Sequence, residues 1–451
     1  MQDSQFRVWY LFLTQVVVVA GFLHWFGQFE AISQVDTASY RDYSFDSVTT
    51  ALNDKRTFVY PSVLRFFEAA DGSERLIPWF QYFVSAASTG FFLSTLLACR
   101  WNHWLAFAAA SPLLASPLVL EYSRILTPDL LAQSFSVVTV SCWLTVISKG
   151  TGLRSLIGLS LFSFLAYQTK PSYLFLLAFA PVGGWIARWW LHPDDRDAWK
   201  VALRMTVASA VPFVAWCALR WALVGHFGLV SFGGYNIIGI AGQWIQKDSM
   251  NQLTAEVQPF AEKILQSREL KKWEPTITYE VMETRFNPMV WDIAVPAAAE
   301  LYDGDSRIMN RRMAELSSQV LKSNPTAYAN WLGKAAKRSV RSAIEITLRN
   351  PIVLVSLPVW FMAFAWNWRK KLEGIVCQNE CIYGCEFQTI VWLALGYAIC
   401  KMGLVILVEP PIDRYCAPAT VFLASVLTMA ACQAILRGRG SMRTTLARRA
   451  S

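Results

Sequence analysis

The chain has 451 residues, of which 54% are hydrophobic and 16% are charged, and its mean hydropathy is +0.32. A water-soluble domain carries about 25% charged residues, so this composition excludes an ordinary globular protein and predicts an integral membrane protein. The formal net charge is +9. Many of the cations flank apolar runs, which indicates membrane orientation rather than a nucleic-acid partner.

Apolar runs predict an all-α polytopic protein with about ten transmembrane helices, judged from the length of each run. The first run follows Arg7 and leads into an aromatic segment without a small-residue cleavage site. We therefore expect a retained anchor rather than a removed signal peptide. The predicted spans cover residues 8–27, 79–98, 103–120, 129–147, 155–168, 171–191, 201–223, 351–368, 388–408 and 415–436.

The connections between these spans predict how the chain is oriented. Cytoplasmic loops are enriched in Lys and Arg, and a cytoplasmic N-terminus places every strongly basic connection on the inner side. We therefore expect both termini in the cytoplasm, the working face outside, and a bacterial inner (plasma) membrane as the location. The inner cations are Arg100, Lys149, Arg154, Arg188, Arg196, Lys200, Arg369, Lys370, Lys371 and the arginine-rich tail from Arg437.

Two long segments then fall on the outer side, at residues 28–78 and 225–350. The first mixes acidic and apolar residues in a way that suits interfacial helices along the membrane surface. The second has several tryptophans and near-balanced charge, which predicts a small, mainly helical extracytoplasmic domain. The chain is thus divided into an N-terminal transmembrane module (1–224), this domain (225–350), and a C-terminal transmembrane module with a basic tail (351–451).

Each of the three short outer connections carries a cation, although the positive-inside rule disfavours Lys and Arg on the outer side. Arg offers a bidentate fork and Lys a compact charge, so together these cations predict a phosphate or pyrophosphate site at the outer leaflet. The alternative is that each pairs with a neighbouring acid, Glu121, Asp129 or Asp413, and only anchors a helix end. The cations are Arg124, Lys170 and Arg414.

The chain shows little sign of a metal site. The only cysteine cluster is Cys377, Cys381 and Cys385, and its four-residue spacing favours reduced cytoplasmic thiols over a zinc site. None of the four histidines is paired with another at ligand spacing. We predict no obligatory cofactor or metal. Binding of a divalent metal by the acidic residues of the first outer loop remains the alternative.

A series of short motifs resembles one family of membrane enzymes. In the first outer loop, Asp36 is followed by Tyr40 and then by Arg56-Thr57-x-x-Tyr60-Pro61. Further motifs follow in the same order as in C-type (GT-C) glycosyltransferases, which include aminoarabinose and protein O-mannosyl transferases. These motifs are Leu126-Thr127-Pro128-Asp129-Leu130-Leu131, Thr169-Lys170-Pro171, Asn324-Pro325-Thr326-Ala327-Tyr328 and Asp413-Arg414-Tyr415.

This resemblance implies an inverting enzyme that moves a sugar from a polyprenyl-phosphate donor to an extracytoplasmic glycan, lipid or protein acceptor. It makes Asp36 the general base. Taken without the resemblance, Asp36 is more typical of a helix N-cap than of a catalytic base, and aromatic residues at this depth are typical membrane anchors. The implied donor phosphate ligands are Arg56, Arg124, Lys170 and Arg414, and the implied substrate pocket is formed by Tyr40, Tyr60, Asp129 and Tyr415.

Two other classes of protein remain open. One is a polysaccharide polymerase or ligase that uses pyrophosphate-linked glycans. The other is a flippase or transporter of lipid-linked sugars, in which the outer cations line a headgroup pathway. Transporters often contain inverted repeats, and the sequence shows none. The large outer segments and the short basic inner loops favour an enzyme.

Overall fold

The structure is a computed structural model that describes residues 2–191, 197–273, 278–372 and 385–450. Helices make up 82% of it, and no β-strand occurs in these residues. A single β-bridge joins Ile32 to Ile125. The all-α prediction is confirmed.

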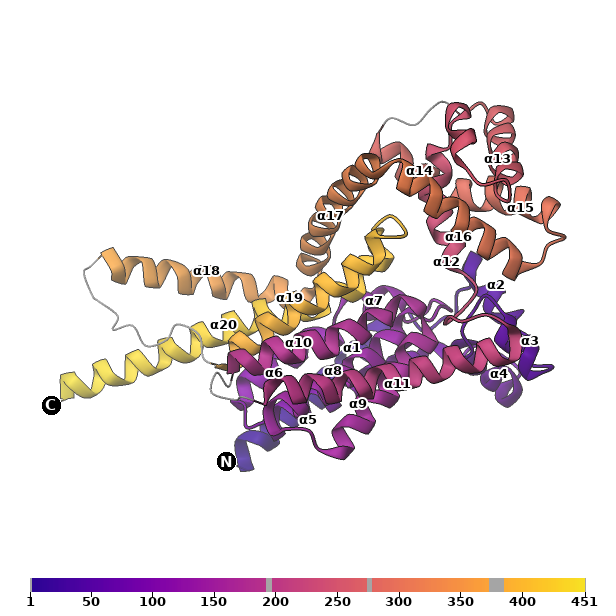
Figure 1. Ribbon diagram of the computed structural model, residues 1–451. Helices are drawn as coiled ribbons and strands as arrows, with labels where there is room; N and C mark the ends of the chain where they lie inside the picture. Colours follow the sequence, from indigo (N-terminus) through magenta and orange to yellow (C-terminus); the bar gives the residue numbers. More distant parts are fainter. Residues whose placement is uncertain (1, 192–196, 274–277, 373–384, 451) are drawn as a thin grey trace.

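Long helices from both ends of the chain run side by side as a bundle (Figure 1). The central helix is α8, which packs against α5 and α9 and is buried along nearly its whole length. Its first residue, Asp129, therefore lies at one end of the bundle core. The bundle helices are α1 (Gln2–Trp25), α5 (Ile77–Ala98), α6 (His103–Leu114), α7 (Pro117–Tyr122), α8 (Asp129–Lys149), α9 (Leu153–Thr169), η1 (Pro171–Phe175), α10 (Leu176–Leu191), α11 (Ala198–Val224), α19 (Cys385–Ile406) and α20 (Asp413–Ala450), with α18 (Pro351–Leu372) beside α20.

Eight of the ten predicted spans each fall on one helix, while 103–120 covers α6 and α7 and 171–191 covers η1 and α10. Fewer than ten stretches are long and apolar enough to cross a bilayer. Six stretches of the described chain qualify, and a seventh if α17 (Pro325–Leu348) and the start of α18, bent by 85°, count as one broken span. With 17 and 16 residues, α9 and α10 fall short of the roughly 20 needed. Polar side chains of α5 that are buried in the bundle, including Gln81 and Thr89, lower its hydropathy. The six stretches are Asp3–Trp25, His103–Tyr122, Asp129–Lys149, Ala198–Val224, Cys385–Ile406 and Asp413–Leu436.

The first outer loop contains three short helices: α2 (Val35–Arg41), α3 (Val48–Asn53) and α4 (Val59–Asp71). Hydrogen bonds tie its start to the segment before α8. The Ile32 amide donates to the Arg124 carbonyl at 2.8 Å, and the Leu126 amide donates to the Ile32 carbonyl at 2.9 Å. The Thr37 hydroxyl donates to the Leu126 carbonyl at 2.9 Å. These bonds fix α2 next to the end of α8.

The predicted extracytoplasmic segment has a hydrophobic core of its own, built from residues between Tyr235 and Ala335. It stands at the end of the bundle that carries α2 and α3 (Figure 1). The backbones of α12 and α16 approach closely at Gly234, where a Cβ atom would lie 2.0 Å from the Asn310 carbonyl oxygen. The elements are α12 (Gly233–Ala241), η2 (Gly242–Trp244), η3 (Lys247–Gln252), α13 (Gln258–Leu270), α14 (Tyr279–Pro288), the π-helix η4 (Met289–Ala294), α15 (Val295–Leu301), α16 (Ser306–Ser323) and α17 (Pro325–Leu348).

Candidate functional site

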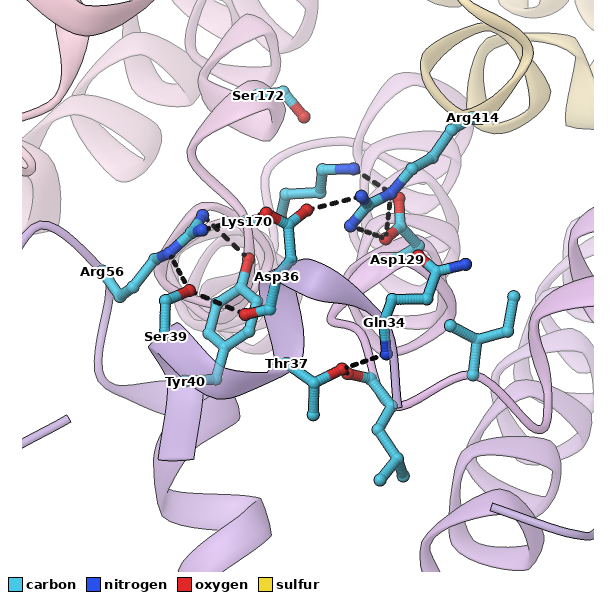
Figure 2. A network of polar contacts seen from close by, with 12 residues as sticks. Gln34, Asp36, Thr37, Ser39, Tyr40, Arg56, Asp129, Lys170, Ser172 and Arg414 are labelled. Atoms are coloured by element: carbon cyan, nitrogen blue, oxygen red, sulfur yellow. Dashed lines mark hydrogen bonds and ion pairs between the residues drawn. The ribbon is translucent and has the colours of Figure 1, made fainter. Parts of the chain in front are cut away.

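The side chain of Asp36 lies between two arginines from distant parts of the chain (Figure 2). Its Oδ1 accepts a hydrogen bond from Arg56 Nη2 at 3.2 Å, and its Oδ2 accepts one from Arg414 Nη1 at 2.6 Å. Asp36 is the second residue of α2, and the N-cap of that helix is Gln34. The N-cap alternative for Asp36 is therefore wrong, and its carboxylate is committed to the two guanidinium groups.

Arg414 connects Asp36 to a second carboxylate, Asp129. Its Nε and Nη2 donate to Asp129 Oδ2 at 3.1 and 3.0 Å, and the Lys170 ammonium donates to Oδ1 of the same side chain. Asp129 is fully buried. Arg414 does not pair with its sequence neighbour Asp413, which bonds Arg349 instead. The cluster is therefore assembled between helix ends rather than within each short connection.

Aromatic rings flank the cations of this cluster. The Arg56 guanidinium carbon lies 4.6 Å from the centre of the Tyr40 ring and 5.4 Å from the centre of the Phe232 ring. Phe232 belongs to the predicted extracytoplasmic domain (225–350), called the second domain below. The Lys170 ammonium lies 4.9 Å from the centre of the Tyr415 ring. Such contacts stabilise partly desolvated cations by about 0.5–2 kcal/mol each. They hold the charged ends in place without neutralising them.

The cluster surrounds a small polar cavity of about 100 Å³ at the junction of bundle, first outer loop and second domain. The ion pairs join three cations, Arg56, Lys170 and Arg414, to two carboxylates. Lys55 and Glu409 add one group of each sign to the lining, so the cations exceed the carboxylates by one, which suits an anion. The cavity is lined by Asp36, Tyr40, Lys55, Arg56, Thr57, Lys170, Pro171, Ser172, Phe232, Asn236, Glu409, Arg414 and Tyr415.

Three of the predicted site residues do not line this cavity. Asp129 is buried beneath it and anchors Lys170 and Arg414. Tyr60 is also fully buried, and its ring packs edge-on against that of Tyr40 with the centroids 5.3 Å apart. Within the described chain, Arg124 makes none of the ion pairs of the cluster, and it contributes its backbone carbonyl to the pairing with Ile32. The predicted residues that do line the cavity are Asp36, Tyr40, Arg56, Lys170, Arg414 and Tyr415.

Sequence reasoning missed three ionisable groups at this site, Lys55, which lines the cavity, Glu409 and Lys401. The exposed fraction of Glu409 is 8%, and this residue lines the cavity from the connection after α19. Lys401 is buried within α19, and its ammonium donates to the Ser172 hydroxyl at 2.7 Å. A lysine inside an apolar run is by default a candidate functional residue. That signal was present in the sequence for Lys401.

Burial and neighbouring charges set the ionisation of the two carboxyls that line the cavity. Burial alone would raise the pKa of Asp36, but the guanidinium groups of Arg414 and Arg56 outweigh it and hold the pKa below its usual value. Burial raises the pKa of Glu409 to about 7, although Lys170 and Lys401 act in the opposite direction. Asp36 is therefore an ionised partner of arginines near neutral pH, whereas Glu409 changes its charge there.

An apolar groove of about 890 Å³ lies between α9 and α11, close to the polar cavity. Phe164 and Trp216 line the groove, and both rings contact Phe58, at centroid distances of 6.4 and 5.4 Å. The residue before Phe58, Thr57, lines the polar cavity and donates to the Thr169 carbonyl at the end of α9. Thr57 at the cavity and Phe58 against the wall of the groove are therefore consecutive residues of the first outer loop.

Within the described residues, no group of three or more His, Cys, Asp or Glu side chains is arranged to hold a metal ion. Cys385 is exposed and free there, and Cys377 and Cys381 lie outside the described residues. The expectation that no metal is obligatory stays a prediction. Comparison of the chain with protein-family models, with curated proteins and with solved structures finds no match. The function is therefore inferred from the geometry of the site.

Proposed function

We propose that this chain is a GT-C-type membrane glycosyltransferase that moves a sugar from a polyprenyl-phosphate donor to an acceptor hydroxyl outside the cytoplasm. The observation that carries the proposal is a positively charged cavity next to an apolar groove. A polyprenyl phosphate has this composition, since it joins an anionic headgroup to a long hydrocarbon chain. That no cofactor is obligatory is part of this proposal.

The donor would lie with its phosphate at Arg56, Lys170 and Arg414 and its hydrocarbon chain between α9 and α11. The two arginines offer bidentate forks and the lysine a compact charge. A phosphate entering the cavity competes with Asp36 for the same guanidinium groups. The ion pairs with Asp36 therefore hold these cations in place for a second anion.

In the transfer step, the acceptor oxygen attacks the anomeric carbon while the bond from that carbon to the phosphate oxygen breaks. The electron pair of the broken bond stays on the phosphate, and the surrounding cations stabilise the added negative charge. A single displacement of this kind inverts the anomeric centre. The acceptor proton passes to a carboxylate of the cavity, where the candidates are Asp36, which the resemblance designates, and Glu409.

The acceptor would approach from the second domain. Phe232 and Asn236 of α12 line the same cavity as the donor-binding cations. An aromatic ring and an amide are suitable contacts for a sugar ring and its hydroxyls. The acceptor class, whether a glycan, a lipid or a protein, and the bacterial inner membrane as location belong to this proposal.

The proposal is tested by incubating the purified full-length protein with polyprenyl-phosphate-linked mannose, glucose and aminoarabinose and a mixed-acceptor extract. Mass spectrometry then measures free polyprenyl phosphate. We expect release from one of these donors. Release from none of them, together with turnover of pyrophosphate-linked glycans, identifies a polymerase or ligase, and movement of intact lipid-linked sugar across vesicles identifies a transporter.

A further inference from the structure

Two carboxyl groups line the polar cavity, and their surroundings differ. Both oxygens of Asp36 accept hydrogen bonds from guanidinium groups, Oδ1 from Arg56 and Oδ2 from Arg414. A carboxylate held in this way is stabilised in its ionised form and is a weak proton acceptor. Asp36 is therefore engaged with cations, and the other carboxyl group that lines the cavity belongs to Glu409.

Glu409 is placed rigidly at the edge of the cavity. Its amide donates to the Val405 carbonyl at 3.0 Å at the end of α19, and Pro410 and Pro411 follow. The fixed φ angles of two consecutive prolines limit the movement of this connection. The exposed fraction of Glu409 is only 8%, yet the residue lines the cavity. Among the described residues, none forms an ion pair with Glu409 within 4.0 Å, and the Tyr415 hydroxyl lies beside its carboxylate.

We propose that Glu409, rather than Asp36, is the catalytic base that takes the proton from the acceptor hydroxyl. This inference rests on the glycosyl transfer proposed above. The acceptor oxygen forms its bond to the anomeric carbon, and its proton moves to the Glu409 carboxylate. The bond between that carbon and the phosphate oxygen breaks, and the lipid phosphate leaves with the electron pair. The phosphodiester donor loses one ester bond and gains one negative charge, which balances the charge lost by Glu409.

The charged groups around Glu409 suit this role. Lys170, Lys401 and Arg414 face it, together with the Tyr415 hydroxyl, and burial raises its pKa to about 7. A base is most effective when its pKa lies near the working pH, because it is then both ionised and able to hold a proton. Glu409 must be ionised to act. Turnover by such an enzyme rises with pH and levels off above about 7.

Asp36 is, on this account, a positioning residue. It holds the Arg56 and Arg414 side chains toward the cavity until the donor phosphate takes over their hydrogen bonds. Loss of its charge should change donor binding more than the chemical step. We therefore expect Asp36 to affect mainly the KM for the donor and Glu409 to affect mainly kcat.

The test compares Glu409→Gln with Asp36→Asn in the full-length protein, using whichever polyprenyl-phosphate sugar releases polyprenyl phosphate. Glu345→Gln, at an exposed position of α17, is the matched control. We expect Glu409→Gln to lower kcat by about 10²- to 10⁴-fold and to abolish the rise of kcat between pH 6 and 8. Asp36→Asn should keep that rise and mainly change the KM for the donor. Thermal unfolding and binding of polyprenyl phosphate show whether each variant is folded.

Three results overturn the inference. The first is a folded Glu409→Gln protein with the kcat of the wild type. The second is an Asp36→Asn protein that loses the pH-dependent rise while Glu409→Gln keeps it. The third is a Glu409→Gln protein that no longer folds while a folded Glu409→Asp protein has the kcat of the wild type, because a catalytic base shortened by one CH₂ group no longer reaches the acceptor hydroxyl. A wild-type protein that releases polyprenyl phosphate from no donor contradicts the proposed function itself, which distinguishes that failure from an error about the base.

Discussion

The Arg414 guanidinium lies 2.6 Å from the Asp36 carboxylate, although 378 residues separate them in the chain. The same side chain binds the fully buried Asp129, so one residue at the start of α20 joins the first outer loop to the bundle core. Removing one partner of a buried ion pair leaves an uncompensated charge. The integrity of the site therefore depends on Arg414 more than on any other cation of the cluster.

We predict that Arg414→Gln lowers the free energy of unfolding by about 3–5 kcal/mol, because Asp129 is left with Lys170 alone. Transfer should fall by at least about 100-fold through loss of a phosphate ligand. Arg414→Lys keeps the charge but cannot bridge two carboxylates, so an intermediate effect is expected. Thermal unfolding in detergent and an assay of polyprenyl phosphate release measure both quantities.

The matched control is Arg341→Gln, which removes an exposed ion pair to Glu345 on α17. Exposed pairs contribute about 0–1 kcal/mol, so little change is expected. If Arg414→Gln and Arg341→Gln have the same free energy of unfolding, the bridge that Arg414 forms between Asp36 and Asp129 contributes nothing to the stability of the fold.

The raised pKa of Glu409 should make the free energy of unfolding fall as pH rises. Its pKa is raised from 4.5 to about 7 by burial, so the folded state binds the proton more tightly than the unfolded state. The stabilising contribution of a group with a raised pKa is present at low pH and is lost as pH rises through the folded pKa. We expect this loss to be on the order of 3 kcal/mol between pH 4.5 and 7.

Thermal unfolding of wild type and Glu409→Gln across this pH range measures the effect. The Gln side chain does not titrate, so the difference in unfolding temperature between the two proteins should change steadily from about pH 4.5 to about pH 7 and level off above that. A constant difference would mean that Glu409 does not titrate in this range.

If the groove binds the lipid, the KM for the donor should depend on the length of its prenyl chain. Ala215 lines the groove on α11, and Val214 beside it is exposed and lies outside the groove. Ala215→Trp should fill part of the groove and raise the KM for a long-chain donor by about tenfold or more, since each buried CH₂ group contributes about 0.8 kcal/mol. A short-chain donor should be used equally well. The same KM change in Val214→Trp would argue against the groove as the lipid site.

The orientation of the chain is open to direct labelling. In a background without native cysteines, Ser47→Cys and Asn251→Cys place thiols in the two long outer segments, and Lys149→Cys places one in an inner connection. All three positions are exposed. A membrane-impermeant maleimide should label the first two on intact cells and the third only after permeabilisation. Labelling of Lys149→Cys on intact cells would reverse the predicted topology.

Hydrophobic run length was sufficient to predict where most helices lie, because a helix that crosses lipid is predominantly apolar. Six or seven stretches of the described chain pass the test of length and hydropathy, so the count of ten spans stays a prediction. Gln81 and Thr89 of α5 are polar but buried among other helices, so their environment depends on packing that no local pattern contains. The lengths of α9 and α10 were likewise set by breaks at Lys170 and Pro171, where the chain enters η1.

The position of a cation at an outer helix end predicted that Lys170 and Arg414 would lie near one another. The partners of those cations could not be predicted, since Asp129 and Asp36 come from other segments. Arg124 has the same sequence signal but stays outside the cluster. Backbone pairing of its connection with Ile32 determines where that segment lies, and backbone pairing leaves little trace in residue type.

The central claim, that the polar cavity and the groove bind one polyprenyl phosphate, is tested most directly by an experimental structure of the protein with this lipid in a nanodisc. We predict phosphate density within hydrogen-bond distance of Arg56, Lys170 and Arg414, with the hydrocarbon chain between α9 and α11. Lipid phosphate bound elsewhere, with the ion pairs of Asp36 to Arg56 and Arg414 intact and the groove empty, would contradict the account.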